Sequence, residues 1–201
     1  MNRREFLKKS LALAVGAGAL ALPGNLGKSL GAAAGPADLA AVKGAEAPEM
    51  FDRGIAALGG IGRFVSKGQT VVVKPNIAWD VEEAIGANTS PALVARIVKR
   101  CIEAGASKVY VFDHTCDLWK RSYARSGIEE AASRAGAAVV PADQAHSYRK
   151  EAIRGARVLK ETRVHELVMK SDVFINVPVL KSHGGAGLTI AMKNLMGIVW
   201  D

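Results

Sequence analysis

The stretch TVVVKPN, residues 70–76, decides how the chain folds. Four β-branched residues that run into Lys-Pro-Asn are typical of a buried strand leaving its sheet for a loop. A helix start follows, with Ser90 as the N-cap and Pro91 at the first helical position. Apolar residues then recur at helical spacing until Gly105, and KVYVFD at residues 108–113 is the next strand. Strand, helix and strand with short connections predict a parallel pair joined by a right-handed crossover.

The rest of the body continues this alternation of helices and strands. About half of the chain, 49%, is hydrophobic, which is enough for one domain with a sizeable core. The sequence predicts a doubly wound α/β domain over residues 49–201, with a mainly parallel sheet and flanking helices. The further expected elements are helices at 50–58, 118–135, 164–169 and after the glycines at 184–187, and strands at 137–141, 156–159 and 172–179.

The amino terminus has the layout of an export signal. Arg3 and Arg4 precede Phe-Leu-Lys, and an uncharged run at 11–22 follows. A helix of that length spans roughly 18 Å, which is too short for the ~30 Å hydrocarbon core of a bilayer. We therefore expect a signal peptide over residues 1–34 and a linker over 35–48; the other interpretation is an amphipathic amino-terminal helix. The segment resembles a twin-arginine (Tat) signal, which implies the Tat translocon as a partner and a periplasmic location or one on the outer face of the cytoplasmic membrane.

The positive charge is not arranged as in a nucleic-acid-binding protein. The chain carries a net charge of +8, and half of it lies in residues 1–34. In the remaining residues the two signs are interspersed, and no basic stripe with interleaved aromatic residues occurs. This pattern argues against nucleic acid as a partner.

Polar, reactive residues follow three of the expected strands. Ligands of doubly wound sheets bind beyond the carboxyl ends of the strands, so these residues are expected to converge. Two histidines at neighbouring strand ends, with Asp113 and Cys116 close in sequence, suggest proton transfer or a metal cluster; surface or capping histidines are the simpler alternative. The candidate catalytic residues are His183, Lys181 and His114.

The glycine-rich stretch GGAGLT, residues 184–189, precedes an expected helix. Such a loop can present backbone N–H groups to an anion, and lysines beside it favour phosphate or carboxylate. It is neither a Walker loop nor a Gly-x-Gly-x-x-Gly motif, and a purely structural turn is the alternative. The candidate anion- or cofactor-binding residues are Lys74, Asn76, Gly184, Gly185, Gly187, Thr189, Lys193 and Asn194.

The two cysteines do not form a cluster-binding motif. Cys101 lies on the apolar face of its helix and is expected in the core. No Cys-x-x-Cys pair occurs, so this chain alone should hold no iron–sulfur cluster. A metal or a metal-containing cofactor stays open, without an assigned ligand set.

Four blocks of the sequence resemble the domain-of-unknown-function 362 family. They are VVKPN at residues 72–76, TSP at 89–91 where a helix opens, NVPVLKSH at 176–183 and KNLMG at 193–197. The resemblance implies redox or metal chemistry, because many members carry Tat signals or ferredoxin-type cysteine clusters. It also implies that the domain runs on past KNLMG, so we expect a sheet and a site that are incomplete at the carboxyl end.

A weaker resemblance is to the nickel-pincer lactate racemase family. His183, Ala186-Gly187, Thr189 and Lys193 fit the spacing of a motif in that family, and His114 follows a strand as a histidine does there. The resemblance implies that Lys193 tethers a cofactor or contacts an anion, and that His183 is a general acid or base.

These observations lead to three functional hypotheses. The first is an exported, enzyme-like domain that binds a small anionic substrate or cofactor at its strand ends. The second is a redox or iron–sulfur-associated accessory or metal-binding protein with a ferredoxin-like partner. The third is an inactive, truncated domain.

Overall fold

The computed structural model describes residues 37–200, and its centre is a four-stranded parallel sheet. The strands are β1 (Thr70–Pro75), β2 (Lys108–Val111), β3 (Ala138–Val139) and β6 (Val173–Val177), in the order β3-β2-β1-β6. The expected central strand is therefore β1, whose Val71, Val72 and Val73 are fully buried. The predicted α/β class with a parallel sheet and flanking helices is confirmed.

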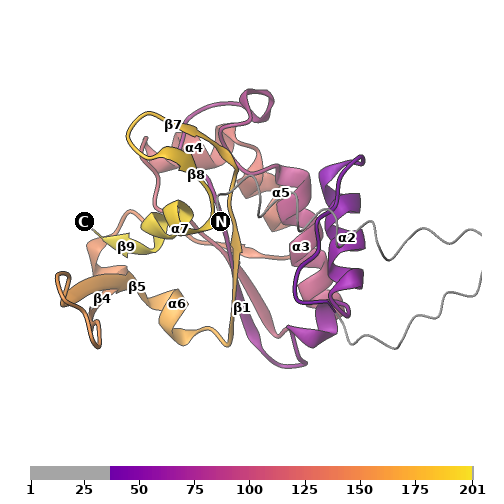
Figure 1. Ribbon diagram of the computed structural model, residues 1–201, viewed down its shortest axis with the longest axis horizontal. Helices are drawn as coiled ribbons and strands as arrows, with labels where there is room; N and C mark the ends of the chain where they lie inside the picture. The colour runs from indigo at the N-terminus through magenta and orange to yellow at the C-terminus, as the bar shows by residue number, and fades with distance from the viewer. Residues whose placement is uncertain (1–36, 201) are drawn as a thin grey trace, which may run out of the picture. The chain divides into compact units, whose positions relative to one another are not determined.

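Helices cover one face of this sheet (Figure 1). They are α2 (Ala47–Ala57), α3 (Pro91–Glu103) and α5 (Ile128–Arg134), with α4 (Trp119–Arg125) preceding α5. The helical spacing in α3 buries Val94, Ile97, Val98 and Cys101 against the sheet, as predicted. Ser90 is the N-cap position of α3, although its hydroxyl donates to Glu83 and accepts no hydrogen bond from the backbone of the helix.

The other face carries a small antiparallel sheet and α6 (Figure 1). This sheet has the order β4-β5-β9, with β4 at Tyr148–Ala152, β5 at Glu161–His165 and β9 at Val199–Trp200, and α6 spans Glu166–Lys170. Val72 of β1 and Phe112, which directly follows β2, form a second core with Tyr148. The short 3₁₀ helices before this sheet are Ile61–Arg63, Glu83–Ile85 and Ala145–Ser147.

Three sequence-based element predictions are wrong. The helix expected over 118–135 is broken at Gly127, whose φ of 73° is left-handed and stops α4 before α5 begins. Residues 156–159, expected as a strand, lie in the loop between β4 and β5 after a left-handed turn at Gly155. The helix expected from residue 164 begins only at Glu166, because the two residues before it end β5.

The glycine-rich stretch also differs from the prediction. Residues 184–186 form the turn of a hairpin between β7 (Lys181–His183) and β8 (Gly187–Thr189), in which Lys181 pairs with Thr189. The helix that follows, α7 (Ala191–Asn194), is a single turn continued by a 3₁₀ segment at Leu195–Ile198. The glycines are therefore separated from the helix start by a strand and do not form a loop at a helix N-terminus.

Two further expectations concern the amino-terminal part of the chain. The signal peptide predicted at 1–34 lies outside the described residues, while α2 starts at Ala47 and so takes the last two residues of the predicted linker. Within residues 37–200, no helix has the length and apolar character needed to cross a membrane.

Candidate functional site

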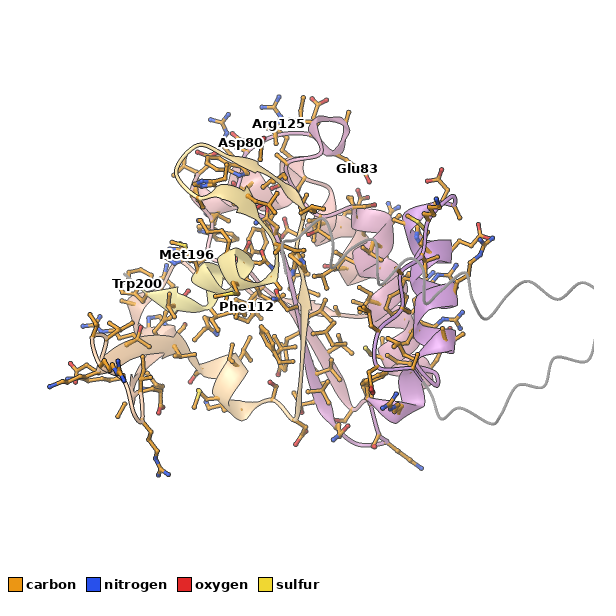
Figure 2. The ribbon with its side chains drawn as sticks, in the orientation of Figure 1. Asp80, Glu83, Phe112, Arg125, Met196 and Trp200 are labelled. Carbon is orange, nitrogen blue, oxygen red and sulfur yellow. The ribbon has the colours of Figure 1, made fainter. Side chains whose placement is uncertain are left out.

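A pocket of about 340 Å³ opens beyond the carboxyl ends of the strands of the parallel sheet. It is bordered by the residues that follow β1 and β2 and by the segment from the β7–β8 hairpin to β9. Met196 and Trp200 of this last segment lie on the side of the sheet away from α3 (Figure 2). Of the predicted site residues, the pocket brings together Lys74, Asn76, His114, Lys181, His183, Thr189, Lys193 and Asn194. Gly184, Gly185 and Gly187 do not line it and are exposed in the β7–β8 hairpin.

The floor of the pocket is a buried ion pair. Lys74 Nζ lies 2.6 Å from Asp113 Oδ1, and the two side chains are 1% and 2% exposed. Asp113 Oδ2 also accepts a hydrogen bond of 2.7 Å from the backbone N–H of Ile77. Burial lowers the pKa of the Lys74 ammonium and raises that of the Asp113 carboxyl, and the attraction between the two charges opposes both shifts. The charge of Lys74 is therefore neutralised by Asp113 and is not available to a ligand. The sequence did not indicate this pairing.

Gly197 closes this ion pair from the pocket side. A Cβ atom at this position would overlap Asp113 Oδ1 and would lie 2.8 Å from Lys74 Nζ. The Gly197 carbonyl also accepts a hydrogen bond of 3.2 Å from the His114 backbone. Glycine is needed here because of close approach and not because of a left-handed backbone.

Asn194 joins the floor to the strands. Its Oδ1 accepts hydrogen bonds from Lys74 Nζ at 3.0 Å and from Asn76 Nδ2 at 3.2 Å. Its Nδ2 donates to Asn176 Oδ1 at 2.7 Å and to the Lys74 carbonyl at 3.2 Å. Because both polar atoms of the buried amide are occupied, Asn194 positions the floor rather than contacting a ligand.

Two lysines supply the positive charge of the pocket wall. Lys181 Nζ donates to Asn76 Oδ1 at 3.0 Å and to the Ala87 carbonyl. Burial lowers the pKa of Lys181, and repulsion from the Lys193 ammonium lowers it further. Lys193 is half-buried and forms no ion pair with another residue of 37–200. Among residues 37–200 Lys181 also has no carboxylate partner, so the pocket wall holds two ammonium groups without a counter-ion.

His183 has a fixed hydrogen-bonding pattern. Its Nδ1 accepts from the backbone N–H groups of Gly185 and Ala186, at 3.1 and 3.0 Å. A neutral ring that accepts at Nδ1 carries its proton on Nε2. The hairpin turn therefore presents His183 as a hydrogen-bond donor, and the backbone of Gly185 and Ala186 holds this ring.

His114 has the opposite tautomer. Its Nδ1 lies 3.4 Å from the carbonyl oxygen of Val199, which can only accept, so the Nδ1 proton points there. The ring stacks on Trp200 with centroids 5.1 Å apart and an interplanar angle of 10°. The lone pair of a neutral His114 is thus on Nε2, where it can accept a proton.

Thr189 has a structural part in this arrangement. Its single hydroxyl proton is shared between the carbonyls of Val179 and Lys181, at 3.1 and 3.3 Å, and so ties β8 to the chain that enters the hairpin. The hydroxyl is buried with these partners, which leaves it little capacity for a ligand.

The comparisons with known proteins give a family but no reaction. The family described as "Domain of unknown function (DUF362)" matches residues 71–201. The chain belongs to the DUF362 family. The match begins in β1 and contains every residue that lines the pocket.

One curated relative of this DUF362 chain is a thylakoid-associated protein of Synechocystis sp. The two are 32% identical over 148 residues, which is 71% of this chain and 43% of the relative. The chain therefore spans less than half the length of that relative. The search of solved structures found no significant match.

Two residues that build the DUF362 pocket were not predicted: Gly197 covers its floor and Asn176 holds Asn194. Asp113 and Cys116, which were expected near the two histidines, line the pocket. Gly197 stands in the KNLMG block, but only its contact with the ion pair shows why a glycine is there. Burial and the Asp113 carboxylate raise the pKa of the Cys116 thiol. Among residues 37–200, no three His, Cys, Asp or Glu side chains come together as a metal site.

Proposed function

We propose that the pocket binds a small anionic ligand through Lys181, Lys193 and His183. The observation that carries this proposal is the charge of the lining. Three lysines line the pocket, and the one carboxylate among its described lining residues, Asp113, is already paired with Lys74. The lining therefore has an excess of two positive charges, supplied by Lys181 and Lys193.

The three side chains offer hydrogen-bond donors of the kind that carboxylate and phosphate require. The two ammonium groups give charge-assisted bonds, and the Nε2–H of His183 adds a neutral donor. The walls also include Val179 and Ile190, which reduce the contact of the charges with water and strengthen the attraction.

His114 is the group of this pocket that can take up a proton. His114 lines the pocket with its Nδ1 at the Val199 carbonyl, which leaves Nε2 as the acceptor, while Lys181 and Lys193 would stabilise negative charge that develops on a bound anion. This division of roles makes proton removal from a bound anion the enzymatic activity that we propose for the site.

Calorimetric titration of the full chain with inorganic phosphate and with acetate tests the binding. Lys193→Gln should weaken binding about tenfold or more, because a hydrogen bond to a charged group contributes about 1.5–3 kcal/mol. The Lys181→Gln, His183→Ala double variant should abolish it. Lys120→Gln, which changes an exposed lysine outside the pocket, is the matched control. Equal affinities in all four proteins would refute the proposal.

We also propose that residues 1–34 direct export by the Tat route. The support is the Arg3-Arg4 pair before a short uncharged run. Replacing both arginines by lysine keeps the charge and should leave the precursor in the cytoplasm of a bacterial host. The control variant Lys8→Arg, Lys9→Arg should be exported normally. Export of the twin-lysine variant at the normal rate would contradict the proposal.

A further inference from the structure

Large apolar side chains are exposed on the segment that builds one wall of the pocket. They come from the β7–β8 hairpin and from the adjoining turn α7 and its 3₁₀ extension, which lie next to each other in Figure 1. Their exposed fractions range from 37% to 85%. We call this set the hairpin patch; it comprises Leu180, Leu188, Ile190, Met192, Leu195 and Met196.

The hairpin patch is continuous with the interior of the pocket. Ile190 and Met196 belong both to the lining of the pocket and to the hairpin patch, with 49% and 59% of their surface exposed. Inside the pocket they are joined by Val179 and Val199. An apolar group that begins near the lysines can therefore pass over these two side chains onto the surface.

The charges on the same segment all have one sign. Residues 173–200 contain Lys181 and Lys193 and no Asp or Glu. The segment therefore combines two cations with an apolar surface and offers nothing that repels an anion.

We infer that the anion is amphiphilic, with its charged head at Lys181 and Lys193 and a single hydrocarbon tail over Ile190 and Met196 onto the hairpin patch. The inference rests on the proposed anion binding and adds the class of ligand. An exposed apolar surface of this kind is commonly a binding surface, and here the cations at its inner end select a negatively charged head. Carboxylate and phosphate heads share this chemistry.

Chain-length dependence of binding tests this inference. Butyrate, octanoate and laurate, and the alkyl phosphates of the same lengths, are titrated into the full chain below their critical micelle concentrations. Each added methylene should tighten binding about twofold to fourfold, as expected for partial to full burial of a CH₂ group. Comparison of the two series shows which head group is preferred.

Variants on the tail path make the test specific. Ile190→Ser with Met196→Ser should flatten the dependence on chain length. The readout is the laurate-to-butyrate affinity ratio within each protein, so that a loss of head-group binding common to both ligands cancels. Val158→Ser, which changes an apolar residue that is 92% exposed in the loop between β4 and β5, is the matched control and should leave it unchanged.

The remaining outcomes separate the two proposals. Binding of butyrate and laurate with equal affinity would overturn the inference that the ligand is amphiphilic, but it would be consistent with the proposed anion binding. Binding of neither series would overturn both. A chain-length dependence that the double variant does not alter would place the tail elsewhere and overturn the inference. So would sedimentation of the full chain as a dimer that the double variant dissociates, because the patch would then be covered by a second copy.

Discussion

Lys74 Nζ and Asp113 Oδ1 lie 2.6 Å apart with both side chains almost fully buried, so the ends of two neighbouring parallel strands are joined by a charge pair. The pair forms the floor on which the carboxyl-terminal segment packs, because Gly197 and Asn194 both contact it. Neutralisation of Asp113 by Lys74 is what leaves the remaining lysines available to an anion.

Removal of one partner of this pair should be costly. Lys74→Met leaves the Asp113 carboxylate buried without its counter-ion, and such changes destabilise proteins by about 3–5 kcal/mol. The double variant Lys74→Met, Asp113→Asn removes both charges and keeps an acceptor for the Ile77 N–H. It should therefore be more stable than Lys74→Met alone. Urea unfolding of the two variants measures this; a double variant less stable than Lys74→Met would show that the charges do not depend on each other.

Gly197→Ala should displace the carboxyl-terminal segment from the ion pair. The new methyl group would overlap Asp113 Oδ1, so we expect a loss of about 1–3 kcal/mol in the free energy of unfolding and weaker anion binding. Gly62→Ala is the matched control, since a methyl group at Gly62 would meet no atom within 4 Å and the backbone there is not left-handed. Thermal unfolding and anion titration compare the two variants. Equal stability and equal anion affinity of Gly197→Ala and Gly62→Ala would contradict the close approach of Gly197 to Asp113.

His165 should make the fold sensitive to mild acid. The ring is 1% exposed and stacks on Phe112, its Nδ1 caps α6 by accepting from Leu167, and burial lowers its pKa from 6.5 to about 4. Between these two values the unfolded chain binds a proton that the folded chain does not. Stability should therefore fall as the pH drops from about 6.5 to about 4, by at most about 3 kcal/mol from this residue.

Unfolding free energies at several pH values test the role of His165. His165→Phe should lose this part of the pH dependence, whereas His146→Gln, at an exposed position, should keep it. Parallel pH profiles for the wild type and His165→Phe would rule out the predicted protonation step.

Cys116 offers a chemical probe of the pocket lysines. It is exposed, while Cys101 is fully buried and its thiol pKa is raised to about 11 by burial. Lys193 and Lys181 lower the pKa of Cys116, against the larger effects of the partial desolvation of its thiol and of the Asp113 carboxylate. Lys193→Gln should therefore slow alkylation of Cys116 by iodoacetamide at pH 8 severalfold, because less thiolate is present.

Mass spectrometry of the alkylated protein gives the rate at each cysteine. Phosphate bound beside the lysines should also slow the alkylation of Cys116. The control variant is Lys170→Gln, which changes a lysine that is far from the pocket in sequence and paired with Glu166, and it should leave the rate unchanged. A rate at Cys116 that none of these changes affects would mean that Lys193 does not influence the thiol.

The central sheet could be predicted because its signals are local. The β-branched run of β1 and the Ser90-Pro91 start of α3 each specify their element within a few residues. Parallel pairing then places the polar residues after β1 and β2 at one edge, so the convergence of Lys74 and His114 followed from topology.

The parts that were not predicted depend on contacts between distant residues. A glycine-rich stretch suits both a hairpin turn and the approach to a helix, and the pairing of Lys181 with Thr189 decides for the hairpin. Lys74 was interpreted as an anion ligand because its partner Asp113 belongs to the end of another strand, which no local pattern shows. The strands β4 and β5 were missed because their exposed, charged residues do not give the apolar run of a buried strand.

A crystal structure of the full chain grown with phosphate would test anion binding most directly. We predict phosphate oxygens within about 3 Å of Nζ of both Lys181 and Lys193, with His183 donating to the same group from Nε2. The Lys74–Asp113 pair should remain intact beneath it. Two results would contradict the proposed anion binding. One is a pocket without phosphate under conditions that saturate binding in solution, and the other is a metal ion held by His114 and Cys116 with both lysines turned away.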